Sequence, residues 1–371
     1  MMVNKPKIVV VGAYGYTGNL VAQELERLNI PFTAVGRNEE KLEALKNRNS
    51  SCEKVKVADI QNQYQFSEWL EAAQLVINCA GPFNYYASPL IDACAALGLV
   101  YFDITGEQQV VRESYSKREA IAKKNGATIV HSLSFESALT DLLLSRSISH
   151  LPMESYRTFN SYYRLKSKQM SPGTKITMKI ASAYKNYAVC DSELTELPVT
   201  SLENSDPIAP NIAHIVPYPE VIFTHKRIQP IASASYYLLE ANDPFVFLLA
   251  AQKGMSPKEI DVQQQVEKHK KLPFDGPTEA ERIGHSFEIH TYLSSGKAIF
   301  YQRLAGTDPY GITACLIGLG VKKFYSYWTN QALDELPLGV VTPAEFLSEF
   351  GDEWLVNSAF MKIEESKIIE P

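Results

Sequence analysis

Short apolar runs alternate with amphipathic stretches along the first 131 residues. The run at residues 7–11 is rich in β-branched side chains and ends in glycines, as a buried parallel strand does. Val21, Leu25 and Leu28 then repeat at helical spacing until Pro31. Five further runs have strand character: residues 32–35, 55–58, 75–78, 100–102 and 128–130. Six short strands separated by helical stretches predict an α/β fold built on a doubly wound parallel sheet.

Capping residues place the boundaries of the predicted helices. Asn38 is expected to cap one helix, and Ser88, directly before a proline, is expected to cap another. Gly98 ends that second helix, and Gly126 ends a polar helix predicted for residues 107–125.

The first strand runs into the turn Gly12-Ala-Tyr-Gly-Tyr-Thr-Gly18, spaced G-x-x-G-x-x-G. Glycines let the backbone turn sharply and approach a pyrophosphate, while the next helix presents free N–H groups to it. A tight structural turn is the alternative, but the surrounding strands and helices favour a nucleotide site. The residues expected to bind the cofactor here are Gly12, Tyr14, Gly15, Tyr16, Thr17 and Gly18.

The end of the second strand predicts which nucleotide binds. Enzymes that use NAD usually place an acid about 20 residues after the glycines, but here that position holds Arg37 and Asn38. A guanidinium suits a 2′-phosphate, so we expect NADP(H) as the cofactor. A solvated arginine at the start of a helix is the alternative.

The next strand ends supply further candidates. Asp59 either accepts from the adenine amino group or is a plain turn aspartate. Glu107 either faces the substrate or caps the following helix. The small residues after the fourth strand leave room for the cofactor to pass towards its nicotinamide, and those expected to line it are Cys79, Ala80, Gly81 and Pro82.

Together these residues resemble the saccharopine dehydrogenase-like oxidoreductases, including the trans-acting enoyl reductases. The resemblance implies an NADP-linked oxidoreductase with a Rossmann domain and an inserted α+β second domain. The domains would be residues 1–140 plus about 305–371 for cofactor, and 141–304 for substrate and dimerisation. The matching segments are residues 12–18, 36–37, 78–83, 93–98 and 101–107, then 171–174, 276–282 and 306–313.

Two segments depart from the family pattern beside the expected nicotinamide. The glycine usual after the Gly-Pro-aromatic turn is missing near Ala87, and the family's proline is replaced at Leu139. The substrate type therefore does not carry over from the family.

The rest of the chain predicts a mixed second domain. We expect a strand at 155–164, a helix at 174–187, a charged helix at 256–271, and a hairpin of 286–293 with 298–304. The proline-rich stretch 190–220 predicts a long irregular loop or lid, and residues 312–321 predict an apolar helix packed on the first sheet.

Composition narrows the class of protein. The chain has 371 residues, 36 basic and 42 acidic, with a net charge of −6, which suggests two domains and no nucleic-acid partner. No apolar run nears the roughly 20 residues that span a bilayer, and the start lacks the apolar segment of a signal peptide, so we expect a cytoplasmic protein. The five cysteines are scattered and indicate reduced thiols, and the seven histidines lack metal-ligand spacing.

The leading hypothesis is an NADPH-dependent reductase of an enoyl or imine substrate, either free or linked as a thioester. Tyr85, Tyr86 or Glu107 would donate the proton, although packing roles are open for both tyrosines. His131 either reaches the active site or is a satisfied core histidine. The 20 tyrosines suggest a substrate with apolar area, such as an acyl chain, but an ordinary core or a homodimer interface would give the same count.

Other chemistries are weaker. Tyr162 and Lys166 have the Y-x-x-x-K spacing of short-chain dehydrogenases, but they stand in strand-like sequence. A regulator that senses NADP without turnover is one alternative. An amino-acid-type saccharopine-like dehydrogenase is another, and it would need cations such as Arg157, Arg164 and Arg303.

Overall fold

A computed structural model describes residues 5–151, 155–166, 169–181, 186–197, 212–239 and 276–369. The chain divides into two compact units, which are interleaved in sequence. The first consists of Met1–Thr105, Gln109–Ala138 and Tyr310–Gly351. The second consists of Gly106–Gln108, Leu139–Pro309 and Asp352–Pro371.

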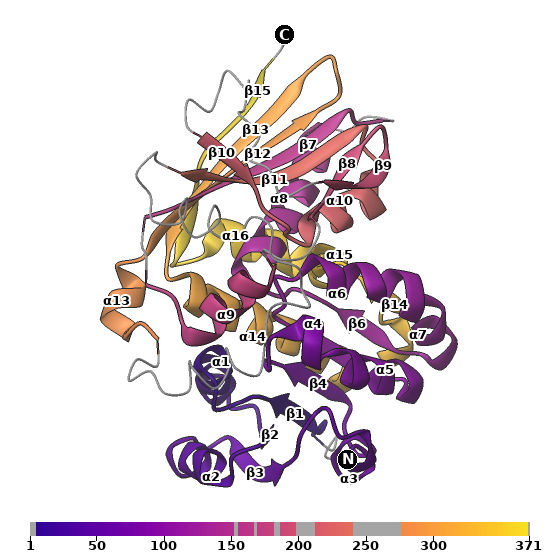
Figure 1. Ribbon diagram of the computed structural model, residues 1–371, viewed down its shortest axis with the longest axis vertical. Helices are drawn as coiled ribbons and strands as arrows, with labels where there is room; N and C mark the ends of the chain where they lie inside the picture. Colours follow the sequence, from indigo (N-terminus) through magenta and orange to yellow (C-terminus); the bar gives the residue numbers. More distant parts are fainter. Residues whose placement is uncertain are drawn as a thin grey trace. The chain divides into compact units, whose positions relative to one another are not determined.

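The first unit contains a seven-stranded parallel sheet in the order β14-β6-β5-β4-β1-β2-β3 (Figure 1). The interior strands are buried on both faces, as in doubly wound sheets that helices cover. The predicted fold class is confirmed. The strands are β1 Ile8–Val11, β2 Phe32–Gly36, β3 Cys52–Val57, β4 Leu75–Asn78, β5 Val100–Asp103, β6 Thr128–Val130 and β14 Gly339–Val341.

The helices of this unit mostly begin and end where the sequence predicted. Asn38 caps α2 by accepting from the Lys41 N–H at 2.8 Å, and Gly98 and Gly126 end α5 and α7 in the left-handed conformation. The helices are α1 Tyr16–Arg27, α2 Glu39–Arg48, α3 Ser67–Leu70, α4 Phe83–Tyr86, α5 Ser88–Leu97, α6 Gln108–Glu113, α7 Glu119–Asn125, α14 Pro309–Thr329 and α15 Pro343–Leu347. Short helical turns lie at Gln63–Gln65, Ser114–Arg118 and Leu333–Glu335.

Two details of this unit differ from the prediction. Ser88 does not cap α5, because α4 runs directly into it and Ala87 holds the cap position in helical conformation. The seventh strand, β14, was not predicted. It has only three residues and pairs with β6, far away in sequence. The apolar helix predicted for 312–321 is confirmed as part of α14, where Gly320 lies against Phe102 of β5.

The second unit is built on a mixed sheet in the order β15-β13-β12-β7-β11-β8-β9, with β10 paired to β11. The predicted hairpin is confirmed as the antiparallel pair β12–β13. The strands are β7 Thr158–Leu165, β8 Asn186–Cys190, β9 Glu193–Leu197, β10 Ile212–Ile215, β11 Ala232–Leu239, β12 Ser286–Ser294, β13 Ile299–Thr307 and β15 Met361–Ile369. The helices are α8 Phe135–His150, α9 Pro172–Ala181, α10 Glu220–Ile228, α13 Glu279–Ile283 and α16 Glu349–Asn357.

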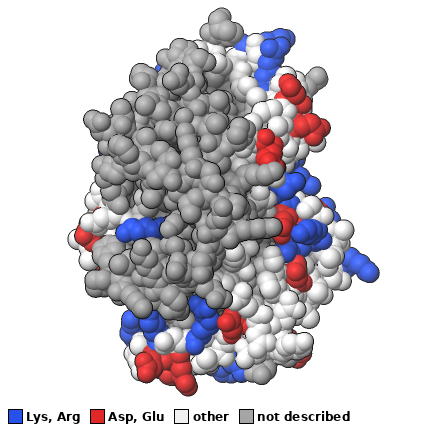
Figure 2. All heavy atoms as spheres, viewed as in Figure 1, with Lys and Arg blue, Asp and Glu red and all other residues white. Residues whose placement is uncertain are grey.

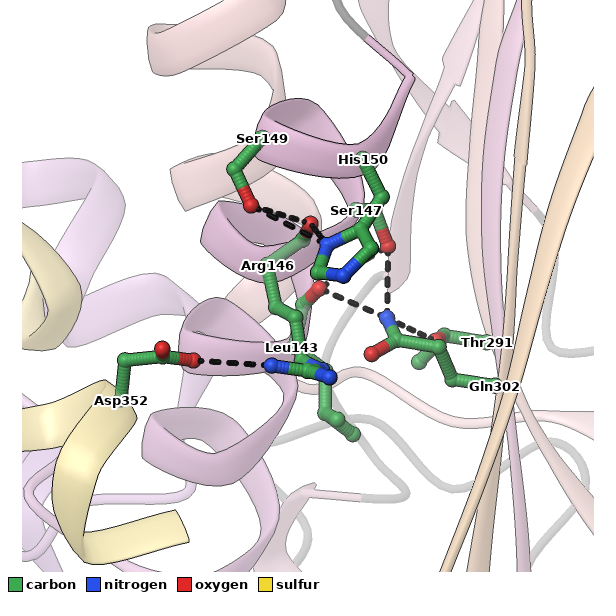
Figure 3. A network of polar contacts seen from close by, with 8 residues as sticks. All are labelled: Leu143, Arg146, Ser147, Ser149, His150, Thr291, Gln302 and Asp352. Atoms are coloured by element: carbon green, nitrogen blue, oxygen red, sulfur yellow. Dashed lines mark hydrogen bonds and ion pairs between the residues drawn. The ribbon is translucent and has the colours of Figure 1, made fainter. Parts of the chain in front are cut away.

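A polar network holds α8 against this sheet (Figure 3). Gln302 of β13 donates to the Leu143 carbonyl at 2.9 Å and to the Ser147 hydroxyl at 2.7 Å. Arg146 reaches Asp352 of α16 at 3.5 Å. Because the amide satisfies a helix carbonyl inside the core, it fixes the position of α8 on the sheet.

Several predictions for this unit are wrong. The helix predicted for 174–187 ends at Ala181, and Tyr187 belongs to strand β8. The stretch 190–220 is not wholly irregular, because it contains β9 and β10. Residues from Asp352 onward belong to the second unit, because β15 pairs with β13. The charged helix predicted for 256–271 lies outside the described residues.

Candidate functional site

The glycine-rich turn after β1 is folded onto itself. The Gly12 N–H donates to the Val35 carbonyl of β2 at 2.8 Å, and the Gly15 N–H donates to the Gly12 carbonyl at 2.9 Å. A Cβ on Gly18 would lie 2.1 Å from that same oxygen, so only glycine fits there. No described side chain caps the first turn of α1, whose N–H groups stay available to an anion.

Tyr14 connects this turn to the end of β2. Its hydroxyl accepts from the N–H groups of Arg37 at 3.1 Å and Asn38 at 3.3 Å. Its ring lies so close to Gly36 that a Cβ there would be 2.4 Å from the ring. The spacing of glycines in the sequence predicts the turn, but the contact between Tyr14 and Gly36 becomes visible only in the fold.

Arg37 is exposed at the end of β2, and its guanidinium carbon lies 6.0 Å from the centre of the Tyr86 ring. This is a cation–π distance. Tyr86 packs on the core of the first unit with one side and faces Arg37 with the other. The contact favours a role for Tyr86 in holding the arginine, whereas its predicted role as proton donor, like that of the half-buried Tyr85, stays a prediction.

The end of β4 is fixed by side chains of its neighbour strand. Asn78 donates to the Tyr101 hydroxyl at 3.0 Å and accepts from the Ala80 N–H at 3.0 Å. Gly81 and Pro82 are joined by a cis peptide. Burial, and secondly the charge of Asp103, raise the pKa of the Cys79 thiol to about 12, so this thiol is neutral at physiological pH.

At the ends of β5 and β6, two buried side chains form an ion-pairing contact. Asp103 Oδ2 lies 2.7 Å from His131 Nδ1, and both side chains are fully buried. Asp103 Oδ1 accepts from the N–H groups of Ser132 at 2.8 Å and Thr105 at 3.1 Å. The other ring nitrogen, His131 Nε2, has no partner in the described part of the chain. His131 is therefore not a fully satisfied core histidine.

The remaining predicted cofactor residues lie around this edge of the first sheet. Tyr16 and Thr17 are half-buried at the start of α1, where the Tyr16 ring meets Tyr310 edge-to-face at 4.9 Å. Asp59 accepts from the Gln61 N–H at 3.0 Å, as a turn aspartate does, and a contact with adenine stays a prediction. Glu107 is different, because it is buried within the segment that belongs to the second unit.

The side chains of the alternative chemistries have other partners. Tyr162 stacks on Tyr236, and Lys166 lies 3.6 Å from Glu288. Tyr162 lies in strand β7 and Lys166 directly follows it, so this Y-x-x-x-K pair cannot have its helical geometry. Arg164 and Arg303 come together on Glu288, at 3.3 and 3.0 Å.

The fold and the glycine-rich turn define a nucleotide-binding Rossmann domain, and the comparisons with known proteins specify its type. Residues 8–130 match the family model of the saccharopine dehydrogenase NADP binding domain. The resemblance predicted from the sequence is confirmed over this domain, and so is NADP(H) as the cofactor of its family. The matched range contains every predicted cofactor residue, from Gly12 to Pro82.

Relatives support the same family. A saccharopine dehydrogenase-like oxidoreductase of Mus musculus is 32% identical over 176 residues, which cover 42% of this chain and 41% of that protein. A trans-acting enoyl reductase of Mycobacterium ulcerans is 33% identical over 141 residues, covering 37% of this chain and 34% of that protein. The chain thus spans less than half the length of these relatives.

One solved structure shares the fold along the whole chain. It is the apo saccharopine dehydrogenase (L-Glu forming) of Saccharomyces cerevisiae, with a TM-score of 0.58 and 11% identity. The alignment covers 98% of this chain and 100% of that one.

Two absences concern the described residues alone. None of their helices is long and apolar enough to cross a membrane, and none of their histidine, cysteine and acidic side chains form a group that would hold a metal ion. Basic and acidic side chains are interspersed over the described part of the face in Figure 2.

Proposed function

We propose that this protein is an NADPH-dependent oxidoreductase. The observation that carries the proposal is the arrangement at the end of β2, where Tyr14 orients the backbone of Arg37 and Tyr86 lies beside its guanidinium. A permanently charged, exposed arginine at this position suits the 2′-phosphate that distinguishes NADPH from NADH. The match of residues 8–130 to an NADP-binding domain supports the same conclusion.

Each strand end at the carboxyl edge of the first sheet would bind a different part of the cofactor. The turn from Gly12 to Gly18 and the first N–H groups of α1 would hold the pyrophosphate, with Asn38 and Asp59 on the adenosine side. The small residues from Cys79 to Pro82 would line the path towards the nicotinamide. NADPH supplies the hydride, and the protein orients it and excludes water.

The substrate class proposed is an enoyl or imine compound, either free or carried as a thioester. The relative named as a trans-acting enoyl reductase supports the enoyl option. Tyr236 and Tyr292, which pack on the buried Tyr162 of the second unit, are only half-buried and offer apolar area. A substrate with several carboxylates is less favoured, because Arg164 and Arg303 already pair with Glu288, and Arg303 also pairs with Glu364.

Cofactor preference tests the proposal directly. The dissociation constants of NADPH and NADH are measured by nicotinamide fluorescence for the wild type and for Arg37→Ala. We expect tighter NADPH binding in the wild type, and a loss of about 10- to 100-fold for NADPH alone in the variant, since charge-assisted bonds contribute about 1.5–3 kcal/mol. Arg48→Ala is the matched control, because this exposed arginine of α2 contacts Asn19 instead.

Turnover then tests the chemistry. NADPH oxidation is followed with crotonyl-CoA, a cyclic imine and simple ketones as probes. Oxidation with the first or second assigns the reductase. Tight NADPH binding with no oxidation by any probe favours the alternative of an NADP-sensing regulator. The cytoplasmic location and the homodimer stay predictions, which cell fractionation and light scattering test.

A further inference from the structure

Three buried polar atoms follow β6 in close succession without a hydrogen-bond partner among the described residues. They are His131 Nε2, Ser132 Oγ and Ser134 Oγ, and none of the three residues is more than 4% exposed. Buried polar groups in folded proteins are nearly always paired, since an unpaired one destabilises by about 1–3 kcal/mol. Their hydrogen-bonding capacity is therefore directed to something other than the described chain.

The orientation of His131 is fixed from the opposite side of its ring. The Asp103 carboxylate accepts from Nδ1, and it is itself held by the N–H groups of Ser132 and Thr105. A carboxylate at Nδ1 selects the tautomer with its proton there, which leaves a lone pair on Nε2. It also stabilises the imidazolium that forms when Nε2 takes up a proton.

The pair lies where ligands of this fold bind. Asp103 is the last residue of β5, and His131 directly follows β6, so both stand at the carboxyl edge of the sheet. β5 adjoins β4, whose end carries the predicted cofactor residues from Cys79 to Pro82. Among the described residues, Tyr101 and Cys79 are the other titratable groups recorded around the pair, and burial raises the pKa of both. Both are neutral near pH 7.

We propose that His131, positioned by Asp103, is the proton donor of the reduction, in place of Tyr85, Tyr86 or Glu107. The inference rests on the proposed function. Hydride from NADPH adds to one end of the substrate double bond, and the electron pair of that bond moves to the other end. That end takes the proton from His131 Nε2, leaving NADP⁺, the reduced substrate and a neutral imidazole, which is reprotonated from solvent.

Two variants separate proton transfer from support of the fold. His131→Asn keeps an N–H donor near the Nδ1 position, and His131→Gln keeps a polar atom near the Nε2 position, but neither side chain titrates. We expect both to bind NADPH within about twofold of the wild type. We expect kcat/KM with crotonyl-CoA to fall by about 10²- to 10⁴-fold, the usual range for a lost general acid. The limb of the pH profile that reflects protonation of the donor should disappear in both.

Asp103→Asn tests the positioning residue. Its amide oxygen still accepts from Thr105 and Ser132, but its NH₂ group faces Nδ1 and forces the proton to Nε2. We expect a smaller loss of kcat/KM than in the His131 variants and a shift of the pH limb. His150→Gln, at an exposed histidine of α8 that contacts the Arg146 carbonyl, is the matched control and should leave the pH limb in place. An unchanged pH limb in His131→Gln, or its loss in Tyr86→Phe or Glu107→Gln instead, overturns the inference.

If NADPH binds but no probe is reduced, nuclear magnetic resonance of His131 tests the inference without turnover. Protein labelled with ¹⁵N-histidine is compared with His131→Gln to assign the His131 resonances. We expect the Nε2 resonance to change, with little change at Nδ1, when NADP⁺ and crotonyl-CoA are added. An Nε2 resonance that does not change when NADP⁺ and crotonyl-CoA are added overturns the inference. Failure of the wild type to bind NADPH overturns the proposed function itself.

Discussion

Two places on the carboxyl edge of the first sheet are built on opposite principles. At the ends of β1 and β2, space is made by glycines, and the hydrogen bonds come mainly from backbone N–H groups. At the ends of β5 and β6, buried polar side chains hold one another, with Asp103 at the centre. The ends of β1 and β2 are suited to binding an anion through backbone N–H groups, which does not depend on a particular side chain. The ends of β5 and β6 are suited to a chemical step, such as proton transfer, that requires one particular side chain.

Among the variants that test this difference, Gly18→Ala should have the largest effect, on the binding of NADPH. The added Cβ would lie 2.1 Å from the Gly12 carbonyl oxygen, and its other close neighbours are also backbone atoms that cannot rotate away. We expect the turn to open and the dissociation constant of NADPH to rise at least about 100-fold. Fluorescence titration measures it. Gly173→Ala, where the nearest atom is 3.7 Å away, is the control, and equal losses in both would contradict the prediction.

A smaller effect, on stability instead of binding, is expected for Asp103→Ala. The change leaves the N–H groups of Thr105 and Ser132 and His131 Nδ1 without their buried acceptor. We expect the free energy of unfolding to fall by about 3 kcal/mol, as measured by urea denaturation. Asp59→Ala, at the end of β3, removes a single accepted bond from Gln61 and should change it by about 1 kcal/mol or less. A similar loss in both variants would remove the distinction between the two places.

The smallest effect is expected for Tyr14→Phe. The ring stays against Gly36, but the acceptor for the Arg37 and Asn38 N–H groups is lost. We expect NADPH to bind about 5-fold more weakly with NADH unaffected, equivalent to about 1 kcal/mol. Titration of both cofactors measures it. Tyr64→Phe, at a tyrosine that is 96% exposed, serves as control, and a loss for NADH as large as that for NADPH would show that Tyr14 supports the whole turn.

Much of the first place could be predicted from the sequence because its signals are local. Glycine spacing, the cap at Asn38 and the arginine at the end of β2 are all visible within 30 residues. The Asp103–His131 pair could not be predicted with the same certainty, because it joins residues on two strands and hydropathy patterns do not show which polar side chains become buried.

The strand and the helix boundary that the sequence did not predict also depend on contacts between residues that are far apart in the sequence. Strand β14 is too short to show a period, and its position is set by pairing with β6. The helix predicted through Tyr187 failed because helical spacing in an aromatic stretch also fits a strand that is buried on both faces, as β8 is.

Strands β14 and β15 are the last two strands in the sequence, and this has a consequence for folding during synthesis on the ribosome. Thr128 of β6 donates to the Pro337 carbonyl across 209 positions, so the first sheet acquires its outermost strand only after most of the second unit has been translated. The six earlier strands can pair as they emerge, while the second sheet must wait for β15, which is translated later still. Neither unit can therefore be produced as one uninterrupted piece of the chain, and linkers that replace the intervening residues are needed to study either alone.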